Sequence, residues 1–173
     1  MAGTESRTAG VIAERLRGLG LEVTTGVGGY GVVGVLKGGK AGPVVAYRAD
    51  MDAIRTDFPD PVSFKSETPG VRHICGHDIH VTGGLGIAEV LSAIKADVPG
   101  TVKFIFQPAE ENLAGAKAML EADVLSSPTP AAIFAIHSSN AEAGQIGCSM
   151  GVGLPGMDNF EVTLEGEGKL DDS

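Results

Sequence analysis

The sequence contains no tryptophan, and only two tyrosines and six phenylalanines among its 173 residues. A hydrophobic core must therefore rest mainly on aliphatic side chains, and 43% hydrophobic residues are enough for a globular domain. No segment approaches the roughly 20 consecutive apolar residues of a membrane-spanning helix. The polar residues 1–7 also lack the apolar stretch of a signal sequence. These absences predict a cytoplasmic protein without a membrane partner.

Basic residues and cysteines are also scarce. Thirteen Lys and Arg face 22 Asp and Glu, which gives a formal net charge of −9, and no basic stripe offsets it. A nucleic acid partner is therefore not expected, because a polyanion would be repelled. Nothing in the sequence requires a disulfide between the two cysteines, Cys75 and Cys148, so we expect reduced thiols.

The spacing of apolar residues predicts alternating helices and strands. Helices are expected over 7–19, 78–96 and 113–122, and strands over 21–25, 32–36, 43–48, 101–107, 131–137, 145–150 and 160–164. Prolines make 56–72 a loop. This alternation predicts an α/β fold with a partly parallel sheet and helices on both faces.

Two of these elements carry more detailed expectations. The helix over 78–96 is expected to be capped by Asp78 and to bury one stripe of apolar side chains, namely Ile87, Val90, Leu91 and Ile94. The strand over 131–137 is apolar up to His137 and is therefore expected to be buried.

The glycine run Gly26-Val27-Gly28-Gly29-Tyr30-Gly31 matches the dinucleotide-binding pattern G-x-G-x-x-G. That site needs a helix directly after the glycines. A β-branched run follows here instead, so a hairpin turn is the favoured interpretation.

Side chains with metal-binding chemistry follow several predicted strands or precede a helix. Asp50 and Asp52 follow one strand, and Glu110 and Glu111 follow another. His137 ends a third strand, and Cys75-Gly76-His77-Asp78-Ile79-His80 precedes a helix. Because sites in open α/β sheets form beyond the carboxyl ends of the strands, we expect these residues to converge. Sulfur, nitrogen and oxygen donors together suit a borderline-soft divalent ion such as zinc, and a leftover carboxylate suits a general base.

Each of these residues has an alternative role. Asp78 and His80 could simply form hydrogen bonds at the helix start, and Glu110-Glu111 could be a solvated pair. Cys75 could be a nucleophile with His77 or His137 as its base. The chain could also be a non-catalytic module with a structural metal site.

Four motifs resemble one known family in order and spacing: residues 48–53 (RADMDA), 75–80 (CGHDIH), 107–111 (QPAEE) and the His137 strand. They are similar to the amidohydrolase branch of the aminoacylase and carboxypeptidase metallopeptidases. That branch includes hippurate hydrolases, N-acyl amino acid amidohydrolases and indole-acetyl-amino-acid hydrolases. The resemblance runs from about Glu5 to Gly168.

The resemblance implies a role for each residue that matches a motif. The implied metal ligands are Cys75, His77, Glu111 and His137. Glu110 would be the catalytic base, and Asp52 would orient a ligand; we place Asp78 and His80 in the same supporting role. The implied cofactor is one or two divalent transition metal ions, with zinc or manganese expected first and nickel or cobalt as alternatives. The implied substrate is a small N-acyl amino acid or peptide.

The resemblance also implies a single, partial domain over 1–173, a phosphorylase/hydrolase-like catalytic domain that is incomplete at both ends. Gly166-Glu167-Gly168 is similar to the start of the family's lid or dimerisation domain, where a catalytic Gly-His usually follows. Lys169 stands here instead, so we expect that domain to be absent after about residue 166. We therefore expect low activity from this chain, and a homo-oligomer or pairing through an open sheet edge.

Overall fold

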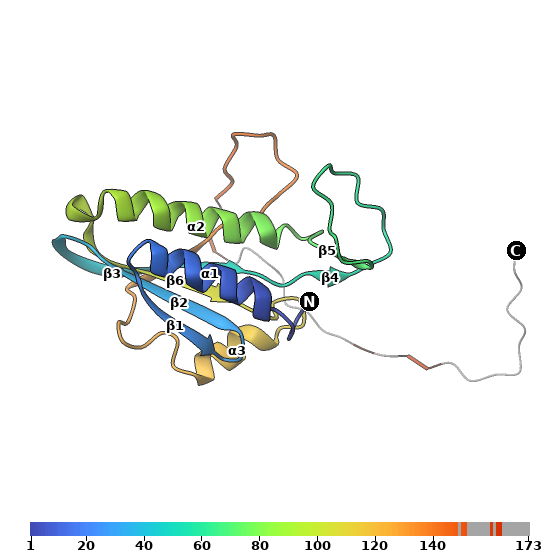
Figure 1. Cartoon of the computed structure of the whole chain (residues 1–173), viewed down its shortest axis with the longest axis horizontal. Coiled ribbons are helices and arrows are strands. Elements are labelled where there is room, and N and C mark those ends of the chain that lie inside the picture. Colours follow the sequence, from blue (N-terminus) through green and yellow to red (C-terminus); the bar gives the residue numbers. More distant parts are fainter. Residues whose placement is uncertain (149, 152–159, 161, 164–173) are drawn as a thin grey trace, which may run out of the picture. The chain divides into compact units, whose positions relative to one another are not determined.

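The computed structural model describes residues 1–148, 150, 151, 160, 162 and 163. These fall into two units, Met1–Ser139 and Asn140–Ser173. All helices and strands described belong to the first unit (Figure 1). In chain order they are α1 (Ser6–Gly18), β1 (Glu22–Val27), β2 (Gly31–Lys37), β3 (Lys40–Asp50), β4 (Ile54–Arg55), β5 (Val71–Arg72), α2 (His77–Ala93), the 3₁₀ helix η1 (Lys95–Asp97), β6 (Pro99–Gln107), α3 (Ala114–Glu121) and β7 (Ala132–Ala135).

The main sheet has five strands in the order β1-β2-β6-β3-β7. β2 is antiparallel to both β1 and β6, whereas β3 is parallel to β6 and β7. Helices α1 and α2 pack on one face with Phe104 and Phe106, and α3 packs on the other face with Ile105. The predicted fold class, a partly parallel sheet with helices on both faces, is therefore confirmed.

Helix α1 follows its sequence pattern closely. Ala9, Ile12, Ala13 and Leu16 recur at intervals of three and four residues, and all four are buried against the sheet. The glycine run forms the predicted hairpin between β1 and β2, so no helix starts there to hold a pyrophosphate. A Cβ on Gly28, where φ is +60°, would lie 2.5 Å from the backbone nitrogen of Met119, so this turn packs directly on α3.

The expected burial and capping of α2 are wrong in part. Val90 and Ile94 are 61% and 51% exposed, because α2 turns another row toward the sheet, which consists of His77, His80, Gly84 and Ala88. Small residues in that row bring the helix close to the sheet, and the bulky side chains at 90 and 94 are left outside. The expected N-cap is also different, since Gly76 occupies that position and Asp78 lies in the first turn.

Strand β7 is exposed along its whole length, whereas a buried strand was expected. The reason is its place at the end of the sheet, where it pairs with β3 alone among the described strands. The loop predicted over 56–72 also needs a small correction. Its last two residues form β5, which pairs antiparallel with β4 just before the loop.

In the second unit, the strand expected over 145–150 is wrong for the residues described. Residues 145–148 have no regular structure, and the Ile146 side chain is 91% exposed, because no neighbouring strand pairs with this segment in the described part. Most of the strand expected over 160–164 lies outside the described residues. None of the helices described is both long enough and apolar enough to span a membrane.

Candidate metal centre

The parallel strands bring three groups of reactive side chains to one edge of the sheet. In the register of the sheet, Asp50 at the end of β3 lies beside Gln107 at the end of β6, and Arg48 lies beside Ala135 at the end of β7. The residues that follow these ends therefore meet, as the sequence predicted. Helix α2 starts at the same edge, because its N-cap Gly76 adopts a left-handed φ of +81° that turns the chain into the helix.

His77 is the centre of the site. Its Nδ1 donates hydrogen bonds to the Asp52 backbone oxygen (3.0 Å) and to Asp52 Oδ1 (3.2 Å). The proton is therefore held on Nδ1, and Nε2 keeps its lone pair. Although burial lowers the pKa of His77, the hydrogen bond to Asp52 and the charges of the neighbouring carboxylates raise it overall.

Nε2 of His77 is buried and has no hydrogen-bond partner among the described residues, and the same is true of Glu111 Oε1. The two atoms lie 3.6 Å apart, and Glu110 Oε2 lies 3.8 Å from the same nitrogen. Buried polar atoms are normally paired, so two unpaired atoms facing each other need an explanation. One metal ion at about 2.0–2.2 Å from each atom would provide it.

Cys75 and His137 complete the donor set. Cys75 Sγ lies 3.7 Å from His137 Nε2, while His137 Nδ1 donates to the Ser138 carbonyl (2.7 Å) and so leaves Nε2 free to accept. Donor atoms of Cys75, His77 and His137 lie within 4.8 Å of one another, as do those of His77, Glu110 and Glu111. The structure therefore brings together all four predicted ligands and the predicted base, with His77 shared by the two groups.

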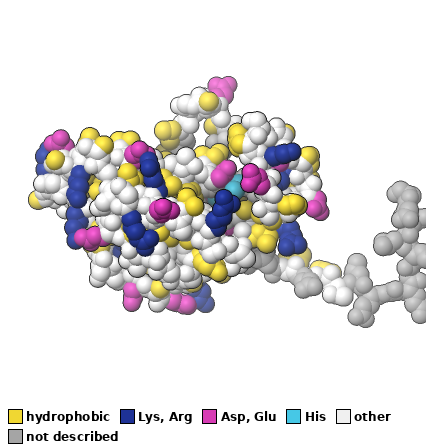
Figure 2. Space-filling model, in the orientation of Figure 1, with side chains coloured by type: hydrophobic (Ala, Val, Ile, Leu, Met, Phe, Trp, Pro, Cys, Tyr) yellow, Lys and Arg dark blue, Asp and Glu magenta, His cyan; other side chains and the backbone are white. Residues whose placement is uncertain are grey.

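The charge at this edge is strongly negative. Burial, and then the charge of Glu111 beside it, raise the pKa of the Cys75 thiol to about 11. Backbone hydrogen bonds tie the acids together, since the Glu111 N–H donates to Asp52 Oδ2 (3.1 Å). Figure 2 shows a small patch of histidine surface between acidic side chains on the face that it views. Four carboxylates and a thiol in one place favour a bound cation.

His80 uses both ring nitrogens within the protein. Nδ1 donates to Asp50 Oδ1 (2.5 Å), and Nε2 accepts the Ser138 N–H (2.8 Å). Its ring also packs edge-on against that of His137, with centroids 4.6 Å apart. This geometry leaves no nitrogen for a metal and makes His80 a link that positions the residues around it. Although burial raises the pKa of Asp50, the His80 hydrogen bond and the Arg48 charge lower it overall.

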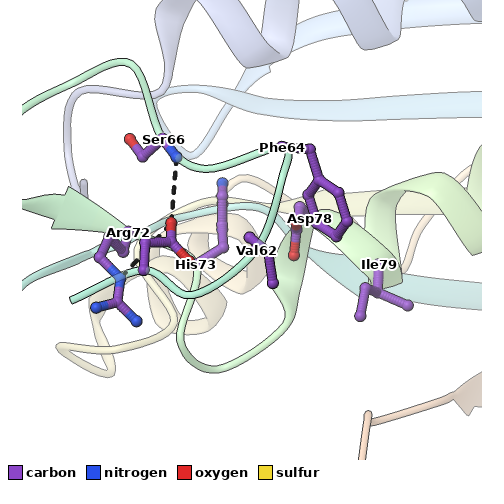
Figure 3. Close-up of a pocket in the computed structure, with 8 residues that line it drawn as sticks. Val62, Phe64, Ser66, Arg72, His73, Asp78 and Ile79 are labelled. Carbon is purple, nitrogen blue, oxygen red and sulfur yellow. Dashed lines mark hydrogen bonds and ion pairs between the residues drawn. The ribbon is translucent and has the colours of Figure 1, made fainter. Parts of the chain in front are cut away.

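The structure does not bring the Asp78 side chain into this cluster. Asp78 is exposed and lines a separate cavity beside the first turn of α2 (Figure 3). Along the chain the cavity wall and the cluster alternate, since His73 precedes Cys75 by two residues and Asp78 directly follows His77.

Sequence reasoning missed three residues that hold the site in place. Arg48 donates to Asp50 Oδ2 (2.8 Å), and the Ser138 hydroxyl donates to the Cys75 carbonyl (3.1 Å). Glu5, before α1, accepts the Ala109 N–H with its Oε1 (2.9 Å) and so anchors the turn that carries Glu110. Arg48 belongs to the motif at residues 48–53, but no local sequence pattern marks Ser138 or Glu5.

Several known proteins are similar to this chain over most of its length. The chain is 43% identical to thermostable carboxypeptidase 2 of Saccharolobus solfataricus, covering 95% of this chain and 42% of that protein. It is 42% identical to N-acetylcysteine deacetylase of Bacillus subtilis, over 80% of this chain and 36% of that protein. It is 39% identical to the Arabidopsis thaliana IAA-amino acid hydrolase ILR1-like 5, over 95% and 37% respectively. The chain thus spans about two fifths of the length of these relatives.

Among solved structures, the YXEP protein of Bacillus subtilis is described as a dinuclear metal binding peptidase from the M20 family. It superposes with a TM-score of 0.74 at 38% identity, covering 80% of this chain and 38% of that one. Residues 46–170 match the sequence model of peptidase family M20/M25/M40. The chain therefore belongs to the M20/M25/M40 peptidase family.

Proposed function

We propose that this chain forms the metal-binding part of a hydrolase that cleaves amide bonds in N-acyl amino acids or small peptides. The observation that carries the proposal is the buried pair formed by His77 Nε2 and Glu111 Oε1, two atoms that face each other without a hydrogen bond. The names of the relatives, a deacetylase, an amino acid hydrolase and a carboxypeptidase, support a substrate of this kind.

Cys75, His77, Glu111 and His137 are the residues that would hold one or two divalent ions. Their mixed sulfur, nitrogen and oxygen donors fit zinc first. Manganese, nickel and cobalt are the alternatives that a binding assay should include. Asp52 would keep the His77 lone pair directed at the ion, through the two hydrogen bonds to Nδ1.

A divalent ion at this site would supply two effects, a lower pKa for a water molecule and a polarised amide carbonyl. Glu110 would handle the proton; its position beside His77 and the 34% exposure of its side chain to solvent support this role. It would accept a proton from the attacking water on its carboxylate and pass it to the nitrogen of the leaving amine. Glu111 is less exposed, at 26%, and its unpaired oxygen suits it to ligation.

The thiol-enzyme alternative is disfavoured by the electrostatics. A nucleophilic cysteine needs a lowered pKa, and an adjacent histidinium commonly provides it. His137 does lie beside Cys75, but burial and the surrounding carboxylates raise the thiol pKa to about 11. A metal cation would offset the same carboxylates, so the site favours a ligand thiolate over a free nucleophile.

A second candidate function, a non-catalytic module that associates through β7, is favoured by one observation. The side chains of Ile133, Phe134 and Ile136 are 49%, 59% and 58% exposed on and beside this end strand. Exposed apolar strands at a sheet edge pair readily with other chains. Light scattering on the metal-loaded protein, beside a variant with Phe134→Lys, would test this: association that the variant abolishes supports the module.

The test of the enzyme proposal separates the two glutamates. Glu110→Gln should leave zinc affinity nearly unchanged and abolish turnover of N-acyl amino acids, because an amide cannot carry the proton. Glu111→Gln should weaken zinc binding itself. Equal zinc loss in both variants would contradict this division, and unchanged zinc content in Cys75→Ala with His137→Ala would show that the site is elsewhere.

A further inference from the structure

A lysine is buried in the strand that leads to the two glutamates of the cluster. Lys103 lies in β6, is 3% exposed, and shares with Ile105 the face of the sheet that α3 covers. Burial lowers the pKa of its amine, and no carboxylate of a described residue pairs with it. Because lysines are almost never fully buried without a partner charge, this amine needs a role.

The Lys103 ammonium binds the loop between α3 and β7. Its Nζ donates to the carbonyl oxygens of Ser126 (2.7 Å) and Pro128 (3.3 Å), the residues on either side of Ser127. Ser127 itself adopts a left-handed φ of +48°, a conformation that is unfavourable for a residue with a side chain. The loop therefore depends on bonds from outside it, and Lys103 provides a bond on each side of the unfavourable residue.

Strand β7, which follows this loop, is weakly held along its own length. It pairs with β3 alone among the described strands, and all of its residues are exposed. A strand with so few buried contacts is positioned largely by bonds at its two ends. After its exit, Ser138 donates to the ring of His80 and to the Cys75 carbonyl. Before its entry, the Ala131 N–H donates to β3 (2.8 Å), and Lys103 holds the loop.

Lys103 thereby joins the two sides of the metal cluster. Its strand, β6, leads to the glutamates, whereas its side chain bonds the loop that leads to β7 and His137. In the register of the sheet, Lys103 lies beside Ala46 of β3, and Ala46 lies beside Ile133 of β7. The amine therefore reaches past the strand between them and fixes the start of β7 relative to β6.

We propose that Lys103 is a positioning residue for His137, on which it acts by fixing the loop before β7. The inference rests on the proposed function through one point, that His137 would hold a metal ion. His137 Nε2 lies 3.7 Å from Cys75 Sγ, and a shift of β7 would take it out of reach of an ion shared with Cys75 and His77. A lysine that only stabilises the fold would affect all ligands alike.

The test is a double-mutant cycle on zinc affinity in the full 173-residue chain. Lys103→Met fills a similar volume without donating a hydrogen bond, and it should weaken zinc binding about tenfold, as expected for losing a residue that orients a ligand. In a His137→Ala background, the same change should alter zinc affinity by no more than about twofold, because the ligand that Lys103 positions is already gone.

Further variants make the cycle specific. Lys103→Arg keeps donors for both carbonyls and should restore most of the lost affinity. Lys117→Met is the control, because it removes a cation that is exposed on α3 and should leave zinc affinity unchanged. Circular dichroism shows whether each variant is folded. If Lys103→Met does not fold, Lys103→Gln takes its place in the cycle, since its shorter side chain remains polar but ends before the two carbonyls.

Nuclear magnetic resonance follows the individual ligands. Zinc should shift the imidazole resonances of both His77 and His137 in the parent chain. In the Lys103→Met variant, the shift at His77 should persist and the shift at His137 should be lost.

The inference is overturned if the Lys103 variant weakens zinc equally in both backgrounds, if it does not weaken zinc at all, or if both histidines lose their shifts together. Failure of the proposed function is read separately, from chains that retain Lys103. In that case the parent and His137→Ala bind zinc equally, which overturns the inference as well. A zinc site that needs His137 but shows no coupling to Lys103 overturns the inference alone.

Discussion

Replacing Glu5 by alanine should loosen the metal cluster, although Glu5 lies about 100 positions away from it in the sequence. Its carboxylate is buried, at 3% exposure, and Oε1 accepts two backbone N–H groups, from Ala109 (2.9 Å) and from Gly3 (3.1 Å). Ala109 adopts a left-handed φ of +51°. That conformation costs an L-residue roughly 1–2 kcal/mol, so the turn that presents Glu110 and Glu111 depends on external support.

The magnitude follows from the hydrogen bond that is lost. Glu5→Ala leaves the buried Ala109 N–H without an acceptor, which costs about 1–3 kcal/mol in the free energy of unfolding. In a chain of this size, each kcal/mol lowers the melting temperature by roughly 2–4 °C. Residues that orient metal ligands also change affinity by about 10–100-fold when lost, so zinc affinity should fall at least tenfold as the turn relaxes.

Two variants make the measurement specific. Glu5→Gln keeps an oxygen acceptor for Ala109 and should remain within about 1 kcal/mol of the parent. Glu14→Ala removes an exposed carboxylate from α1 and should change neither property. Thermal unfolding of the metal-free protein and competitive zinc titration provide the readouts. If Glu5→Ala behaves like Glu14→Ala in both, the anchoring role is wrong.

Three further predictions concern the start of α2 and its partners. In metal-free protein carrying Cys148→Ser, iodoacetamide should alkylate Cys75 slowly at pH 8. The rate should rise about tenfold per pH unit toward the thiol pKa of about 11. A rate that levels off below pH 9 would contradict the raised pKa. Gly76→Ala should lower the free energy of unfolding by roughly 1–3 kcal/mol, because a Cβ there would lie 2.2 Å from a neighbouring side-chain oxygen. A Cβ at Gly86 would meet open space, so Gly86→Ala should raise the free energy of unfolding by about 0.5–1 kcal/mol. Thermal unfolding measures both changes. His80→Ala should lower cobalt affinity about 10–100-fold and alter the cobalt absorption spectrum, whereas an unchanged spectrum would mean that His80 does not position the ligands.

The sequence predicted the parts of this structure that local patterns determine. The apolar stripe of α1 and the β1–β2 hairpin follow from residue spacing and turn chemistry alone. The meeting of Asp50, Glu110 and His137 also followed, because parallel strands end at the same edge of a sheet. The position of each candidate ligand was thus predictable, although its role remains a prediction.

What the sequence did not reveal depends on how elements pack. The buried row of α2 contains Gly84 and Ala88, and no hydropathy pattern favours these over Val90 and Ile94. The anchoring of Ala109 by Glu5 is likewise a contact between distant segments, so no local motif contains it. Exposure of β7 depends on its place in the sheet, which composition does not define.

The contacts around the cluster span most of the first unit of the chain. Glu5 is bonded across 104 positions to Ala109, His80 across 58 positions to Ser138, and Cys75 faces a residue 62 positions away. Such an arrangement cannot persist in an unfolded chain, so any ion bound there binds the folded state alone. By mass action, an ion at 100 times its dissociation constant would add about 2.7 kcal/mol to the free energy of unfolding. Metal occupancy and folding of this unit would then form one equilibrium, and a chelator would act on the protein as a denaturant.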